Sequence, residues 1–326
     1  MYALVDCVSF YASCETVFRP DLRDSPILVM SNNDGCCVTL NEKAKALGFQ
    51  KFKPFYQLKP LIDHHQAIVF SSNYELYGWL SNQVMETLAT FASDHEVYSI
   101  DESWLDFTGH SDLRATGHEM IATVQQYTGL ATRVGFGSNK TLCKVASVVA
   151  KRVKAANGVC CIDDDGTQRR TILERFPVGQ VGGVGPKTAV KLKALGIHSA
   201  LELADYDKDS LRTQFGITVE RTARELNGQK CFNFHEDVVE QQQIIVSRSY
   251  AKPIYYLKPL QSITIGYLEK AMAKLRANNQ IVRHITFTAS TSRFSGNYQS
   301  IQNVITLPAH TSDTLTAARF VSMGIE

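Results

Sequence analysis

The stretch of sequence that decides the fold, residues 96–107, reads Glu96-Val97-Tyr98-Ser99-Ile100-Asp101-Glu102-Ser103-Trp104-Leu105-Asp106-Phe107. Two runs rich in β-forming residues flank the acidic pair Asp101-Glu102, which predicts two antiparallel strands joined by a tight turn. We therefore expect a β-hairpin that presents two carboxylates at one edge of a sheet.

A third carboxylate ends the N-terminal strand. The apolar run of residues 2–5 stops at Asp6, which lies 95 positions before Asp101 but ends a strand that can neighbour the hairpin in one sheet. Three carboxylates at one sheet edge repel each other unless a cation neutralises them, and oxygen ligands favour Mg²⁺. The pattern predicts a site for two-metal phosphoryl or nucleotidyl transfer, while turn acids that bind no metal remain an alternative on spacing alone.

A basic helix is expected to follow a further strand at residues 133–136. At 100° per residue, Lys140, Lys144 and Lys151 share one face of a helix that begins near Thr141. We expect this face to present ammonium groups to solvent, where they either stay hydrated or contact phosphate.

Residues 168–232 are expected to be a compact helical segment. It contains the run Val181-Gly182-Gly183-Val184-Gly185-Pro186-Lys187-Thr188. Pro186 occupies the position at which a Walker phosphate-binding loop needs glycine, so a helix-hairpin-helix fits better. Backbone N–H groups at the start of such a helix can bind a nucleic-acid phosphate, which makes Gly183, Gly185 and Lys187 candidate contacts; a purely structural turn remains open.

Composition excludes several classes of protein. The 326 residues are 44% hydrophobic and 20% charged, as in ordinary globular proteins of more than one domain. No run of about 18 apolar residues and no basic N-terminal signal occurs, so we expect a cytoplasmic protein without a membrane contact. The eight cysteines show no Cys-x-x-Cys spacing, which favours reduced thiols and no structural metal.

The positive charge is concentrated near the C-terminus. Residues 241–326 hold nine Lys or Arg and three Asp or Glu, a net charge of +6, so the remainder carries −4 of the total +2. After a polar linker at 233–243, we expect a small α+β module with strands at 244–248, 285–290 and 301–307 and a helix at 265–278. Its charge predicts nucleic-acid contact, with Arg248 and Arg293 as candidates, or else a solvated surface.

Several motifs resemble those of a known family. Residues Asp6–Glu15 and Tyr98–Glu102 resemble the first and third catalytic motifs of the Y-family translesion DNA polymerases. Residues Glu15–Leu22, Leu28–Gly35 and Phe70–Tyr77 are similar to the UmuC type within that family. The resemblance runs from residue 1 to about residue 290.

The resemblance implies an α+β, multidomain, right-hand polymerase. Its parts are a palm at 1–20 and 75–166, small fingers at 21–74, a helical thumb with the helix-hairpin-helix at 167–232, a linker at 233–243 and a little finger at 244–326. UmuC-type chains usually continue further, so we expect an incomplete little finger that lacks the peptide for a sliding clamp.

The resemblance also assigns roles to individual residues. Asp6, Asp101 and Glu102 would bind two Mg²⁺ ions, with the Cys7 carbonyl as a further ligand. Tyr11 falls at the steric gate that excludes a 2′-hydroxyl, with Phe10 beside it under the nucleotide. Lys45 and Lys151 take the triphosphate contacts. Glu42 departs from the pattern, and its charge is expected to weaken nucleotide affinity by repulsion.

The implied function is error-prone, template-directed DNA polymerisation in translesion synthesis during the SOS response. Its substrates would be primer-template DNA and dNTPs. A processed UmuD-like dimer and a RecA filament would be partners, and a sliding clamp is not expected without the usual tail. Two alternatives are a catalytically silent DNA-binding or regulatory subunit and another carboxylate-metal enzyme such as a nucleotide cyclase. The helix-hairpin-helix and the basic module argue against the cyclase.

Overall fold

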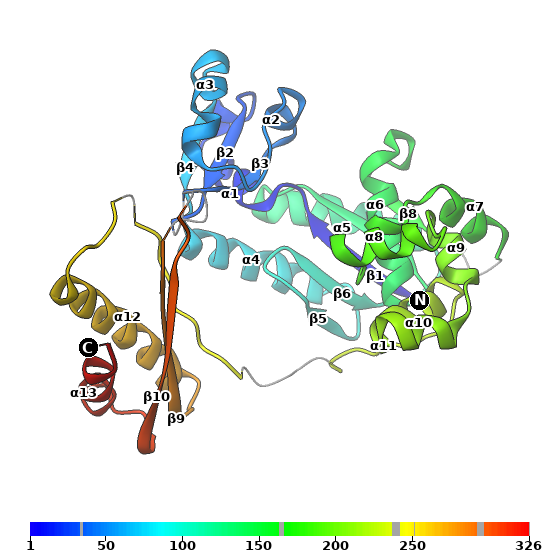
Figure 1. Cartoon of the computed structure of the whole chain (residues 1–326). Coiled ribbons are helices and arrows are strands. Elements are labelled where there is room, and N and C mark those ends of the chain that lie inside the picture. The colour runs from blue at the N-terminus through cyan, green and yellow to red at the C-terminus, as the bar shows by residue number, and fades with distance from the viewer. Residues whose placement is uncertain (33–34, 163–165, 237–241, 251, 292–296, 326) are drawn as a thin grey trace. The chain divides into compact units, whose positions relative to one another are not determined.

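A computed structural model of the chain describes all residues except 33–34, 163–165, 237–241, 251, 292–296 and 326. It divides into two compact units (Figure 1). The first comprises residues 1–31 and 36–238, and the second comprises residues 32–35 and 239–326. Each unit contains buried apolar side chains of its own.

A five-stranded sheet forms the centre of the first unit, with the order β5-β6-β1-β7-β8. Its middle strand β1 (Tyr2–Cys7) pairs antiparallel with β6 (Glu102–Asp106) and with β7 (Thr132–Gly137). At the edges, β5 (His95–Val97) is antiparallel to β6 and β8 (Val159–Cys161) is parallel to β7. The run β5–β6 is the hairpin that the sequence predicted around Asp101-Glu102.

Helices cover both faces of this sheet, which explains why β1 is apolar almost throughout. Phe136 on β7 lies next to Gly117 of α5 (Leu113–Thr128), whereas the adjacent Gly135 faces α6 (Lys140–Arg152). Successive strand residues point to opposite faces, so α5 and α6 lie on opposite sides. Helix α4 (Tyr74–Ala89) packs against α5.

The contact between α6 and β7 is a close approach of two backbones. A Cβ atom on Gly135 would lie 2.2 Å from the Ser147 nitrogen and 2.5 Å from the Cys143 carbonyl oxygen. A Cβ on Gly137 would lie 2.9 Å from the Cys143 nitrogen. The strand therefore requires glycine at both positions if the helix is to keep its place.

A smaller, three-stranded sheet belongs to the same unit. Strand β2 (Ile27–Met30) lies between β3 (Cys37–Leu40), to which it is antiparallel, and β4 (Ile68–Ser71), to which it is parallel. Its helices are α2 (Glu42–Ala46) and α3 (Phe55–His65). Helix α1 (Phe10–Val17), which follows β1, contacts this sheet and α4.

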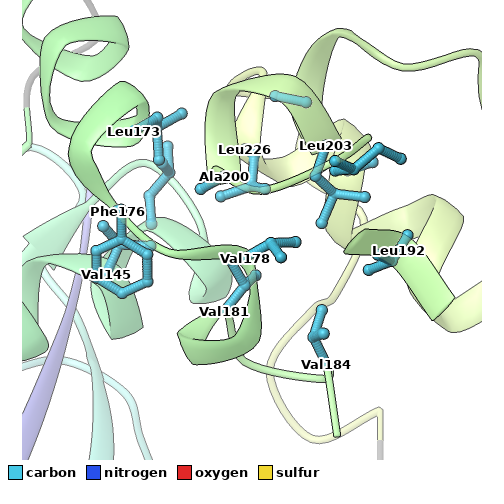
Figure 2. Packing of buried hydrophobic residues seen from close by; sticks show 14 of the residues in the cluster. Val145, Leu173, Phe176, Val178, Val181, Val184, Leu192, Ala200, Leu203 and Leu226 are labelled. Atoms are coloured by element: carbon cyan, nitrogen blue, oxygen red, sulfur yellow. The ribbon is translucent and has the colours of Figure 1, made fainter. Parts of the chain in front are cut away.

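A bundle of short helices shares its core with α6. It contains α7 (Thr167–Arg175), α8 (Pro186–Ala194), α9 (Ala200–Asp205), α10 (Lys208–Phe215) and α11 (Ile217–Leu226). Figure 2 shows Leu173, Phe176 and Val178 of the bundle beside Val145 of α6. Helix α6 is thus buried between the large sheet and the bundle. In the described part of this unit, 3-10 turns lie at Pro20–Leu22, Lys154–Ala156 and Val178–Gln180.

The segment after α11 returns to the large sheet. The buried Glu225 carboxylate accepts hydrogen bonds from the backbone N–H groups of Thr141, Cys231 and Phe232. The Phe234 ring then packs edge-on to Tyr2, with 4.6 Å between ring centroids.

The Lys140 side chain corrects one prediction. It is not on an exposed basic face but is buried, with its Nζ 2.9 Å from both carboxylate oxygens of Glu96 on β5. The same carboxylate accepts the backbone N–H of His235. The Glu96 carboxylate replaces the water that the ammonium group loses when Lys140 is buried.

The second unit consists of α12 (Leu257–Ala277), β9 (Val282–Ser290), β10 (Ser300–Thr311) and α13 (Thr314–Ile325). The strands pair antiparallel, and both helices lie on one side of them (Figure 1). The buried residues between the layers are Leu268, Met272, Leu275, Ile305, Leu307, Ala317 and Val321.

Two expectations for this unit were wrong. Residues 244–248 form no strand, since β9 and β10 pair with each other in the described part of the unit. Helix α12 begins at Leu257 and not at residue 265, because Pro259 is tolerated in a first helical turn, where its missing N–H has no partner to lose. None of the helices in the described ranges is long and apolar enough to cross a membrane.

We predict that Gly135→Ala lowers the free energy of unfolding by about 2 kcal/mol or more, because the added methyl group collides with the α6 backbone. Gly78→Ala is the matched control: a Cβ there meets nothing within 4 Å, and alanine in a helix raises stability by up to about 1 kcal/mol. Both tryptophans, Trp79 and Trp104, lie in the first unit, so urea unfolding followed by tryptophan fluorescence measures its stability. Equal effects of the two substitutions would contradict the close backbone packing.

Candidate active site

Three acids meet where β1 and β6 run side by side. Asp6 is directly opposite Glu102 in the antiparallel register, and the backbone N–H of Cys7 donates to the Asp101 carbonyl oxygen at 2.9 Å. Directly opposed residues carry their side chains on the same face of a sheet. The pairing therefore brings together carboxylates that the sequence separates widely, as the hairpin and the N-terminal strand predicted.

The acids influence each other's protonation. Burial foremost, then the charges of Glu102 and Asp101, raise the pKa of Asp6 to about 6. The pKa of Glu102 is also raised, by burial and then by the charge of Asp101. Both shifts show that negative charge is concentrated in a partly desolvated place, where a cation would be stabilised.

Ser99 holds the bend that carries two of these acids. Its hydroxyl donates to Asp101 Oδ1 at 2.7 Å and accepts the backbone N–H groups of Asp101 and Glu102, at 3.2 and 3.0 Å. In the described ranges, no three His, Cys, Asp or Glu side chains converge closely enough to hold a metal ion. The three carboxylates lie on adjacent backbone positions and offer only oxygen atoms, which is the type of donor that Mg²⁺ prefers.

Positive groups lie beside the acids. Arg133 on β7 is the register partner of Asp6 on the side away from Glu102, and the charges of Lys151 and Arg133 lower the pKa of Asp6. Partial burial and then the charge of Lys45 lower the pKa of Lys151. The structure thus brings the two lysines that the resemblance singled out close to each other and to Asp6, although they come from α2 and α6.

Glu42 lies among these cations. Its Oε1 is 2.7 Å from the Nζ of Lys45 on the same helix, and the hydrogen bond from Lys45 lowers its pKa. The charges of Lys45, Lys151 and Arg133 lower the pKa of Glu42 further. The carboxylate therefore neutralises part of the positive charge that the site would offer to an anion.

Lys144 of α6 also lies near the acids. Its Nζ is 4.1 Å from the centroid of the Tyr98 ring, a cation–π contact. Its charge opposes the rise in the pKa of Glu102. Lys144 thus compensates one of the clustered carboxylates.

Aromatic rings surround Tyr11 at the start of α1. The Tyr11 ring stacks on Tyr77 with 4.4 Å between centroids, and Tyr74 meets it edge-on at 6.0 Å. The charge of Asp101 contributes to a raised pKa of Tyr11, after burial and Tyr74, so the phenol lies near the acids. Phe10 is only 3% exposed and belongs to the apolar core, so its ring lies beneath Tyr11 and not on the surface of the site.

The candidate DNA contacts lie elsewhere. Gly183 has a φ of +84°, which favours glycine, and Gly185 precedes the first turn of α8, where Lys187 is exposed. Arg248 is exposed in the second unit. Arg293 lies outside the described residues.

Sequence reasoning missed Ser99 and Arg133 at the site, and it missed Tyr77, which stacks on Tyr11. Arg133 had a signal, because it is the one charged residue in the apolar run 132–137. Lys144 was placed on the basic helix face, whose lysines were expected either to stay hydrated or to contact phosphate. Nothing local distinguishes Ser99 or Tyr77, since their contacts arise from a turn and from tertiary packing.

Comparison with protein families gives two matches. The model of the impB/mucB/samB family matches residues 5–148. The model of the impB/mucB/samB family C-terminal domain matches residues 241–323. Together they cover most of the chain, including the three acids.

Individual relatives agree with these matches. The chain is 40% identical to protein UmuC of Salmonella typhimurium over 320 residues, which are 96% of this chain and 76% of the relative. It is 38% identical to protein MucB of Escherichia coli, over 90% of this chain and 71% of the relative. DNA polymerase IV 1 of Bacillus subtilis is 34% identical over 69% of this chain and 54% of the relative.

Solved structures share the fold. A Y-family DNA polymerase chimera, Dbh-Dpo4(243-245)-Dbh, superposes with a TM-score of 0.75 at 19% identity and covers 99% of this chain and 92% of its own. An insertion ternary complex of Dbh DNA polymerase gives a TM-score of 0.62 at 21% identity, with 99% and 92% covered. The chain therefore belongs to the impB/mucB/samB family, and it shares the fold of the Y-family DNA polymerases.

Proposed function

We propose that the chain carries out error-prone, template-directed DNA synthesis past lesions by two-metal-ion nucleotidyl transfer. The observation that carries the proposal is the register of β1 and β6, in which Asp6 faces Glu102 beside Asp101. In this scheme the five-stranded sheet is the palm, the three-stranded sheet the fingers, the helical bundle the thumb and the second unit the little finger.

Each group of residues has a separate task. Asp6, Asp101 and Glu102, with the Cys7 carbonyl, would hold two Mg²⁺ ions. When bound, these ions lower the pKa of a primer 3′-hydroxyl and neutralise charge on the triphosphate. The carboxylates that hold these ions must be ionised. The raised pKa of Asp6 reflects burial and the negative charge of its neighbours, and the ions would neutralise that charge.

The basic residues and the gate act on the nucleotide. Lys45, Lys151 and Arg133 would bind the triphosphate and stabilise the charge that develops on the leaving pyrophosphate. Tyr11 would lie under the sugar, where its ring leaves no room for a 2′-hydroxyl. Phe10 would support Tyr11 from the core rather than touch the nucleotide.

DNA would also be bound by residues that do not belong to the acid cluster. The first-turn N–H groups of α8 at Gly185 and Lys187, with Gly183 in the preceding turn, would bind a backbone phosphate. Arg248 would contact DNA from the basic second unit. Identity to UmuC supports the further proposal that a processed UmuD-like dimer and a RecA filament assist the enzyme in the cytoplasm.

Asp101→Ala is expected to reduce primer extension at least about a hundredfold, because a charge that acts on the transition state is lost. The measurement is extension of a primer with Mg²⁺ on undamaged and abasic templates, with and without the processed UmuD-like partner and RecA. Asp106→Ala, at the end of β6 that is farther from Asp101, is the control and should extend normally. Extension by Asp101→Ala at the wild-type rate would refute the site. A wild-type chain that binds DNA but never extends a primer would support the silent-subunit alternative.

Tyr11→Ala should raise the ratio of kcat/KM for ribonucleotides to that for deoxynucleotides by at least about tenfold, or about 1.4 kcal/mol. The reason is that removal of the ring opens space at the 2′ position. Single-nucleotide incorporation kinetics with paired dNTP and rNTP give this ratio. Tyr127→Ala removes an exposed tyrosine from α5 and serves as the control. If Tyr11→Ala keeps the wild-type ratio, Tyr11 is not the residue that excludes the 2′-hydroxyl.

Glu42→Gln is expected to lower the KM for dNTP by up to about fivefold at unchanged kcat. The neutral amide no longer competes with the triphosphate for Lys45, and exposed ion pairs contribute up to about 1 kcal/mol. Asp63→Asn breaks the comparable exposed pair with Lys59 on α3 and should leave KM unchanged. A higher KM in Glu42→Gln would mean that Glu42 orients Lys45 for binding instead of competing.

A further inference from the structure

Tyr77 is joined to helix α1 at two points. Its side chain is fully buried on α4, and its ring lies 4.4 Å from that of Tyr11, tilted by 15°. Its hydroxyl donates a hydrogen bond to Glu15 Oε1 at 2.5 Å. Glu15 follows Tyr11 by four residues on the same helix, so one side chain contacts both.

The hydroxyl contact fixes where the Tyr77 ring lies. Burial, and after it the hydrogen bond to Glu15, raise the pKa of Tyr77, so the phenol remains a donor at neutral pH. A hydrogen bond from a neutral hydroxyl to a carboxylate is short and strong. This hydrogen bond therefore holds the Tyr77 ring at a defined position along the axis of α1.

The Tyr11 ring, in contrast, is held by no hydrogen bond within the described part of the chain. Of its aromatic neighbours, Tyr74 and Phe10 meet it edge-on or tilted, at 6.0 and 5.8 Å, and Tyr77 meets it face to face. A stacked ring opposes rotation about χ1 more than an edge contact does, because rotation would break the whole contact area. Tyr77 is thus the neighbour that determines the position of Tyr11.

We propose that Tyr77 is a positioning residue for sugar selection: it holds the Tyr11 ring rigidly, so that a nucleotide with a 2′-hydroxyl cannot displace it. This inference rests on the proposed role of Tyr11. If the Tyr11 ring could rotate away, it would not exclude a ribonucleotide. The preference for dNTP over rNTP therefore depends on Tyr77 as well as on Tyr11. Deoxynucleotide addition, which needs no such exclusion, should depend little on Tyr77.

The test compares Tyr77→Leu with Tyr77→Phe in single-nucleotide incorporation of dNTP and rNTP. Tyr77→Leu removes the stacked ring and should lower the preference for dNTP at least about fivefold, with kcat for dNTP within about twofold of wild type. Tyr77→Phe keeps the ring but loses the bond to Glu15, so its preference should lie between those of Tyr77→Leu and wild type. A merely structural role would reduce dNTP and rNTP incorporation together and leave the ratio unchanged.

A double-mutant cycle shows whether Tyr77 acts through Tyr11. In the Tyr11→Ala background, Tyr77→Leu should cause no further loss of selectivity. Additive losses, or a wild-type ratio in Tyr77→Leu, would overturn the inference. If Tyr11→Ala itself keeps wild-type selectivity, the gate assignment fails instead, and the two failures are thereby distinguished.

Thermal unfolding accompanies each variant, because Tyr77 is buried. If Tyr77→Leu does not fold, Tyr77→Phe and Glu15→Gln decide the question, since both keep the ring and weaken its anchor. Tyr77→Phe and Glu15→Gln should each lower the preference for dNTP to the same partial extent. The variant that combines the two substitutions should show no further loss of this preference. Wild-type ratios in both would overturn the inference.

Discussion

Helix α6 lies so close to strand β7 that no side chain fits at Gly135. The site depends on this contact in several ways. Lys144 and Lys151 extend from α6 toward the acids, while Lys140 from its first turn is bound to Glu96 on the sheet edge. Its other face, including Val145, completes the core of the helical bundle (Figure 2). A shift of α6 would therefore move the cations of the site and the bundle together.

Charge in the site is nearly balanced before any substrate arrives. Asp6 lies between the negative Glu102 and the positive Arg133, and Glu42 lies close to Lys45 and Lys151. Each carboxylate is thus partly compensated, and each cation is partly occupied. Under the proposed function, a nucleotide and a metal ion would replace these internal interactions, so the affinity for a nucleotide would reflect an exchange of partners and not simple attraction.

Prediction from sequence succeeded where the signal was local. The hairpin at Asp101-Glu102 and the strand ending at Asp6 follow from short runs of apolar and β-forming residues, and the opposition of Asp6 to Glu102 follows from their places at strand ends. Prediction from sequence was wrong where the local structure depends on a residue or strand that is distant in the sequence. Residues 244–248 have a strand-like composition but no neighbouring strand in the described part of the second unit, and Lys140 is buried only because Glu96 meets it. The stack of Tyr11 on Tyr77 has no sequence signal, because it joins two helices through tertiary packing.

The position of β1 has a consequence for biosynthesis. Residues 2–7 leave the ribosome well before residues 102–106 and 132–137, which are their partners on the two sides. The nascent chain must therefore carry an apolar, unpaired strand until its second partner has emerged, and such long-range pairings form slowly. The pairing of Asp6 with Glu102 can exist only after residues 102–106 have emerged. An N-terminal fragment that ends before β7 would expose one whole edge of β1, which makes it a natural client for chaperones and a source of aggregation.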